Sequence, residues 1–177
     1  MIRKATINLE YANTGKKEAL KALLIEYNRA VNCFVDYLWE RQQFKGSFVK
    51  ETKWLTSNIS ACLKQAAAKQ ALAIVKSQRK RAKKTKPSFQ KLNMELDSRF
   101  LKFEAGENSF DLWLTLASLG NKLKLILPSR KHKQFNKFYV TQSVWNIISP
   151  RFHFFLSSVN ERDDLHLKFT WNNFMLI

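Results

Sequence analysis

The 177-residue sequence predicts an α+β fold, a small antiparallel β-barrel split by a helical hairpin inserted after its first strand. Apolar residues recur at every second position near the N-terminus, every three to four positions over two long segments, and again every second position from about residue 99. The lone first strand must pair with a distant strand, because an unpaired strand leaves backbone groups exposed. The predicted divisions are residues 1–13 for the first barrel strand, 14–86 for the helical insertion and 87–177 for the rest of the barrel.

The first strand and both helices follow from these periods. Residues 2–11 alternate between apolar and polar side chains, as a half-buried strand does. Thr14 is expected to cap a helix that begins near Lys16 and continues to about Arg41. Its apolar face contains Leu20, Leu23, Leu24, Tyr27, Val31, Phe34 and Leu38. A second, Ala-rich helix is expected after residues 56–58 and can approach the first closely. Its apolar face is predicted to contain Ile59, Leu63, Ala67, Ala71 and either Ile74 or Val75.

The C-terminal half is predicted to form a series of antiparallel strands. They are expected at about residues 99–104, 110–116, 123–127, 143–148, 152–156 and 165–171. Turns are expected at 106–108 and 120–121, where Gly and Asn occur together. Pro128 is expected to end the third of these strands, and residues 129–139 are expected to form a short helix.

The composition excludes several classes of protein. A chain with 45% hydrophobic and 13% aromatic residues can bury a core, so it is no disordered basic tail. No apolar run approaches the ~20 residues of a membrane span, and the N-terminus lacks the apolar stretch of a signal peptide. We therefore expect a cytoplasmic protein with no membrane partner. Cys33 and Cys62 are predicted to be reduced, buried thiols, since they form no CxxC pair and cytosolic disulfides are rare.

The net charge of +17 is concentrated in two segments. Residues 52–94 contain 11 Lys or Arg and no acidic residue, and residues 112–160 contain 7 Lys or Arg and no acidic residue. The remaining 13 basic and 14 acidic residues nearly cancel. Such segregation favours contact with a polyanion, although a basic surface without a partner is an open alternative.

The candidate nucleic-acid-binding residues lie in these two segments. Some positive charge at a helix C-terminus suits the helix dipole, but seven basic residues within eleven exceed that need. The first group is Lys76, Arg79, Lys80, Arg81, Lys83, Lys84 and Lys86. The second group is Lys122, Lys124, Arg130, Lys131, His132, Lys133 and Lys137. Phe89 is the aromatic residue expected to be exposed and to stack on a base, with core packing as the alternative.

The sequence offers little that predicts catalysis. It contains no GxxxxGK[ST] phosphate loop and no HExxH motif, and its three histidines and two cysteines have no metal-site spacing. The pair Asp163–Asp164 lies in a polar stretch typical of a turn. We therefore predict a binding protein with no cofactor, no metal and no catalytic residues of its own.

Several short segments resemble TnpB-type proteins, the transposase-associated proteins of insertion sequences. These are RNA-guided nucleases related to type V CRISPR effectors. The resemblance covers residues 2 to about 152 as a series of loosely spaced segments. They are 86–89 (KPSF), 94–104 (MELDSRFLKFE), 110–114 (FDLWL), 119–120 (LG), 126–128 (ILP), 132–138 (HKQFNKF) and 145–148 (WNII).

The resemblance implies a wedge domain, in which a β-barrel split by a helical recognition insertion grips guide RNA and target DNA. In the family a catalytic RuvC-like domain follows, with an Asp in a Gly-x-Asp-x-Gly segment that this chain lacks. Residues 153–177 are expected to be a divergent or truncated end of the barrel. The leading hypothesis is a truncated TnpB-like protein that binds RNA or DNA without cleaving it. The alternatives are a mobile-element remnant without function and a subunit that completes a nuclease with a separately encoded catalytic half. A stand-alone ribosome-associated or repressor-like binder is also left open. The oligomeric state is left open.

Overall fold

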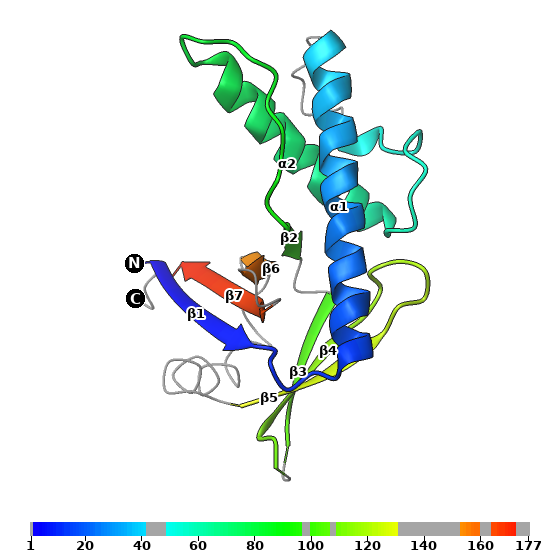
Figure 1. Cartoon of the computed structure of the whole chain (residues 1–177), viewed down its shortest axis with the longest axis vertical. Coiled ribbons are helices and arrows are strands. Elements are labelled where there is room, and N and C mark those ends of the chain that lie inside the picture. Colours follow the sequence, from blue (N-terminus) through cyan, green and yellow to red (C-terminus); the bar gives the residue numbers. More distant parts are fainter. Residues whose placement is uncertain are drawn as a thin grey trace, which may run out of the picture.

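The computed structural model (Figure 1) describes residues 2–41, 49–96, 100–106, 109–130, 153–159 and 164–172. In chain order its elements are β1 (Ile2–Asn8), α1 (Thr14–Arg41), α2 (Ala61–Arg79), β2 (Asn93–Leu96), β3 (Leu101–Ala105), β4 (Leu112–Leu116), β5 (Leu125–Ser129), β6 (His153–Val159) and β7 (Asp164–Asn172). The mixed α+β class and the two helices that follow the first strand are confirmed. The predicted strand at 143–148, and the predicted 129–139 helix beyond residue 130, lie outside the described residues.

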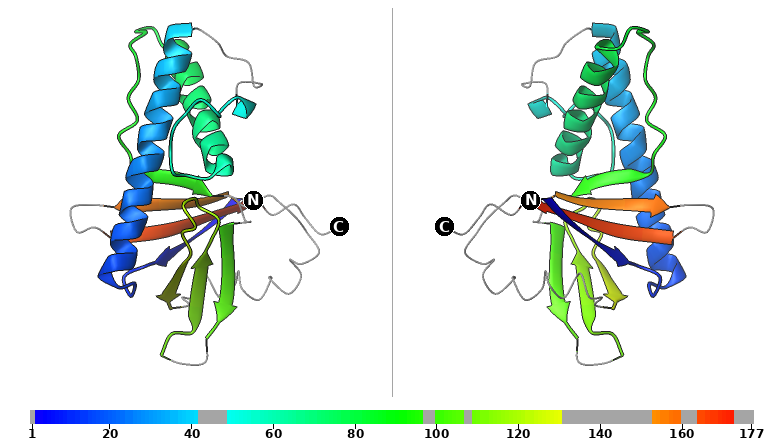
Figure 2. Two further views of the ribbon diagram at one scale, coloured as in Figure 1. Left: turned by 90° about the vertical axis from the view of Figure 1, so that its right-hand side faces the viewer. Right: turned by 90° about the vertical axis from the view of Figure 1, so that its left-hand side faces the viewer.

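The described strands form two open antiparallel sheets, with strand orders β1-β7-β6-β2 and β3-β4-β5. The first strand does pair with a distant one, because β1 lies antiparallel to β7 with Ile2 opposite Asn172 and Asn8 opposite His166. A closed barrel is not shown by these strands. Figure 2 shows the strands of the two sheets running in different directions below α2, with the N-terminal part of α1 extending down beside them. The Ser129 hydroxyl connects them, since it donates to the Asn8 carbonyl at 3.0 Å.

Helix α1 has the predicted buried face, with all seven expected apolar side chains inside the core. The prediction that Thr14 caps this helix is wrong. Asn13 is the cap, because its side-chain oxygen accepts from the Lys16 backbone N–H at 3.0 Å. The first turn of α1 also contacts β5, where Lys16 Nζ donates to the Ile126 carbonyl at 2.6 Å.

Helix α2 packs on α1 through small side chains. Ala67, Ala68 and Ala71 are fully buried, which allows the close helix approach that the sequence indicated. Val75 is fully buried, whereas Ile74 is partly buried. Both cysteines are free thiols, as predicted. The prediction that they are buried is wrong, because Cys33 is half-buried and Cys62, in the first turn of α2, is exposed.

The turn between β4 and β5 anchors the three-stranded sheet to the start of α2. The Ser60 N–H donates to the Leu119 carbonyl at 3.0 Å, and Ile59 forms a β-bridge with Gly120. The expectation that Pro128 ends the strand is wrong, because β5 includes Pro128 opposite Trp113. An edge strand tolerates proline, since the missing N–H can face the open edge.

Candidate nucleic-acid interface

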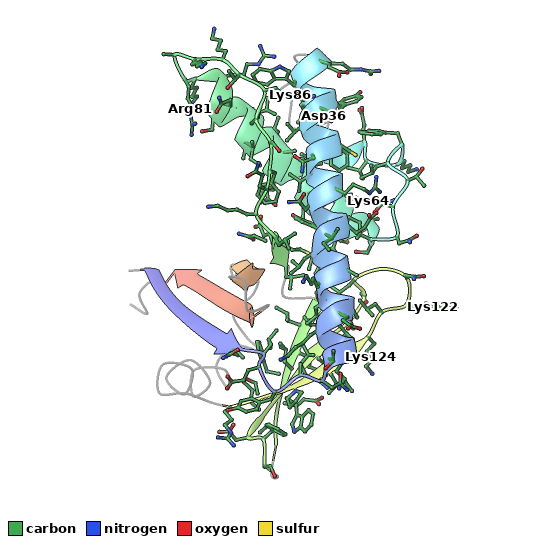
Figure 3. All side chains as sticks on the ribbon, viewed as in Figure 1. Asp36, Lys64, Arg81, Lys86, Lys122 and Lys124 are labelled. Carbon is green, nitrogen blue, oxygen red and sulfur yellow. The ribbon has the colours of Figure 1, made fainter. Side chains whose placement is uncertain are left out.

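Five of the predicted binding residues form an exposed cationic group at the C-terminal end of α2, which we call the helix-end patch. Its members are Lys76, Lys80, Arg81, Lys83 and Lys84. Helix α2 ends at Arg79, so four of the five lie on the turn after it. No carboxylate in the described part of the chain forms an ion pair with them. Figure 3 places Arg81 at the end of the helical pair that is far from the sheets.

Two other predicted binding residues of this segment have partners within the fold. The Arg79 guanidinium lies 4.1 Å over the Trp39 ring and donates to the Trp39 carbonyl at 2.9 Å. Lys86 pairs with Asp36 at 2.8 Å (Figure 3), and this hydrogen bond raises the pKa of Lys86. Both residues therefore tie the end of α2 and the following loop to the last turns of α1, and Arg79 is only partly exposed.

Phe89 belongs to the core boundary more than to an exposed surface. It is half-buried and packs against the core, so the core-packing alternative is observed in place of the exposed ring. Asn32 binds its backbone on both sides, accepting from the Phe89 N–H at 2.9 Å and donating to the Phe89 carbonyl at 2.9 Å. Asn28 also donates to that carbonyl, at 2.8 Å. These bonds hold the segment that follows the helix-end patch along the side of α1.

Two members of the second predicted group, Lys122 and Lys124, lie elsewhere on the molecule. Lys122 and Lys124 are exposed near the turn before β5, and Figure 3 shows them beside the N-terminal end of α1, far from Arg81. The 19-residue α2, whose far end carries the patch, is about 28 Å long. Lys124 is also close enough to Glu104 to contribute, after Lys102, to lowering the pKa of that carboxyl. Lys122 and Lys124 therefore do not form one continuous patch with the cations at the end of α2.

The remaining predicted residues divide between one described side chain and four outside the described residues. Arg130 is exposed and lies 5.1 Å over the ring of Tyr11, which in turn packs against Phe110 at 5.3 Å. The positions outside the described residues are Lys131, His132, Lys133 and Lys137. The sequence predicted a strand through residue 11 and therefore gave no sign of the Tyr11 contact. In the structure β1 ends at Asn8, whose side-chain oxygen accepts from the Glu10 N–H, so the chain turns before it reaches Tyr11.

The carboxylate of Glu26, on α1, helps to hold the loop that precedes α2. Glu26 accepts from Arg29, with the closest contact at 2.7 Å, and from the Ser57 hydroxyl. The bond from Arg29 is the main reason why the pKa of Glu26 falls to about 2. Arg29 also donates to the Thr56 carbonyl at 2.8 Å, so this cation holds the loop and is occupied within the fold.

Within the described ranges, no group of three or more His, Cys, Asp or Glu side chains is arranged to hold a metal ion. Neither α1 nor α2, the two described helices, is long and apolar enough to cross a membrane. Comparison with known proteins finds neither a protein-family model nor a curated protein that matches the chain. The likeness to TnpB-type proteins therefore stays a prediction from the sequence segments.

Proposed function

We propose that the chain binds nucleic acid through the helix-end patch, as the recognition region of a TnpB-like protein. The observation that carries this proposal is the concentration, within residues 76–84, of five exposed cationic side chains that form no ion pair with a described carboxylate. Lysine and arginine side chains that contact phosphates release condensed counterions, which gives a large and salt-dependent contribution to binding. An internal acidic partner would reduce that gain, and no described acid is paired with these five side chains.

The patch is also presented in a defined position. Arg79 and Lys86 attach its two sides to α1, through Trp39 and Asp36. The loop between them is therefore held at both ends, which lowers the conformational entropy lost when a ligand orders it. The proposal includes the wedge-like barrel implied by the resemblance, in which the two open sheets would belong to one closed unit around the strand pairs β1–β7 and β3–β4.

The experiment is to purify the tagged full chain at moderate salt and to sequence the nucleic acid that accompanies it. We expect a discrete RNA population, strongly reduced for the variant Arg81→Gln/Lys83→Gln/Lys84→Gln. A variant that loses the same charge elsewhere, Lys17→Gln/Lys50→Gln/Lys102→Gln, should retain it. A random mixture of RNA and DNA, removed equally from all three proteins by salt, would contradict the proposal and favour a remnant with a merely adhesive surface.

A further inference from the structure

A stack of three side chains lies on α1 outside the predicted binding residues. The indole of Trp54 stacks on the Tyr37 ring, with centroids 5.0 Å apart and planes at 23°. Trp54 also makes an edge contact with Phe34 at 5.2 Å and 81°. The Arg41 guanidinium lies 4.4 Å over the same Tyr37 ring and donates to its hydroxyl at 2.8 Å. The Tyr37 ring thus contacts both the indole of Trp54 and the guanidinium of Arg41.

Trp54 is the exposed aromatic ring of this stack. It is 46% exposed, among the highest values for a large apolar side chain in the described residues. Its neighbours Thr52 and Leu55 are only 4% exposed, so the loop that carries the indole is itself packed. The indole is stacked on Tyr37 and makes a T-shaped contact with Phe34, while 46% of the side chain remains exposed to solvent.

The stack lies toward the same end of α1 as the contacts that anchor the loop of the helix-end patch. Tyr37 directly follows Asp36, the partner of Lys86, so both lie in the same turn of α1. Successive helix residues are about 100° apart around the axis, so Tyr37 lies about 100° around α1 from the Lys86 contact at Asp36 and about 160° from the Arg79 contact at Trp39. A single strand that follows the patch around this end of the hairpin would pass both features.

We propose that the outer face of Trp54 is a stacking platform for one unpaired base of single-stranded RNA. Every base has a π-face, and specific RNA recognition commonly stacks unpaired bases on aromatic rings and guanidinium planes. The platform is pre-ordered by Tyr37, Phe34 and Arg41, so little side-chain entropy is lost on binding. This inference rests on the proposed function, since the phosphates of the same strand would be held by the helix-end patch.

The test measures the affinity of the full chain for an oligouridylate of about 12 nucleotides and for an RNA duplex of the same length. Trp54→Leu keeps apolar packing on Tyr37 and removes the ring, and we expect it to weaken oligouridylate binding about 5- to 150-fold. Duplex binding should not change, because paired bases offer no free face. Trp54→Phe should retain most of the affinity. Ile25→Ala, which alters an exposed apolar residue of α1 (52% exposed), should match the wild type for both ligands.

The outcomes separate this inference from the proposed function. If both RNAs bind with strong salt dependence and Trp54→Leu has no effect, the platform is wrong and the proposed function stands. If Trp54→Leu weakens both ligands equally, the residue acts on the fold and the platform is again wrong. If neither RNA binds the wild-type protein, the proposed function fails and the platform with it. An effect seen with oligothymidylate and absent with oligouridylate would overturn the assignment to RNA.

Discussion

Gly120 is expected to be the glycine least tolerant of a side chain among those in the described residues. Its φ is +122°, in a region that L-residues rarely adopt. A Cβ there would collide with the Asn58 carbonyl oxygen and approach the Ser60 nitrogen to 2.7 Å. Backbone strain of this kind costs about 1–3 kcal/mol, and displacing the Ser60-to-Leu119 hydrogen bond costs about 0.5–1.5 kcal/mol. We therefore expect Gly120→Ala to lower the free energy of unfolding by about 2–4 kcal/mol.

Urea and thermal unfolding followed by circular dichroism measure this change. For a chain of this size, 2–4 kcal/mol corresponds to a fall in Tm of roughly 5–15 °C. Gly15→Ala is the matched control, because Gly15 lies in the first turn of α1 and a Cβ there meets nothing within 4 Å. Alanine favours helix, so the control should raise stability by up to about 1 kcal/mol. Equal stability of Gly120→Ala and the wild type would refute the close approach of this turn to α2.

Three further changes test other contacts. The pKa of Glu26, about 2, is below its usual value of about 4.3 in an unfolded chain, so its stabilisation is complete above pH 4.3 and is lost as pH falls toward 2. After allowance for solvent screening at the half-exposed Arg29, Glu26→Gln should lower the free energy of unfolding by about 1–2 kcal/mol at pH 7. The variant's free energy of unfolding should also change less between pH 5 and pH 2 than that of the wild type. An equal change with pH in the two proteins would contradict this. Asn32→Asp places a carboxylate against the Phe89 carbonyl in place of a donor, so it should cost about 1–3 kcal/mol at pH 7 and recover part of this in acid, where the protonated group can donate. Arg79→Met removes the contacts with Trp39 and should lower Tm by about 2–6 °C, whereas Arg81→Met should leave Tm within about 1 °C in the same scan.

The periodicity of the sequence predicted the elements that are long or strongly patterned. The buried face of α1 and the pairing of β1 with a distant strand follow directly from the positions of apolar residues. The sequence did not predict β2, because its four residues, Asn93–Leu96, are too few to show a period and acquire strand structure by pairing with β6. Pro128 was misread because only the sheet order shows that β5 is an edge strand.

Charge along the sequence predicted where the candidate interface is, but it could not predict which cations are available. Arg79 and Lys80 are adjacent, yet Arg79 lies over Trp39, and this depends on how the two helices cross. Lys86 is occupied by Asp36, which is 50 residues earlier in the chain. The Trp54–Tyr37 stack was missed for the same reason, since Tyr37 and Trp54 are 17 residues apart in the sequence and meet only after α1 and the residues before α2 have packed. The only signal in the sequence was an isolated tryptophan beside Lys53.

The most direct test of the central claim is the salt dependence of RNA binding by the wild type and the two triple-glutamine variants. If all five cations of the helix-end patch contact phosphates of a single strand, log K should fall with log salt at a slope of about −3.5, or roughly 100-fold between 50 and 200 mM salt. Arg81→Gln/Lys83→Gln/Lys84→Gln should reduce the slope by about 2, and Lys17→Gln/Lys50→Gln/Lys102→Gln should leave it unchanged. Equal slopes for the two variants would show that binding depends on net charge alone and would contradict a defined interface at the end of α2.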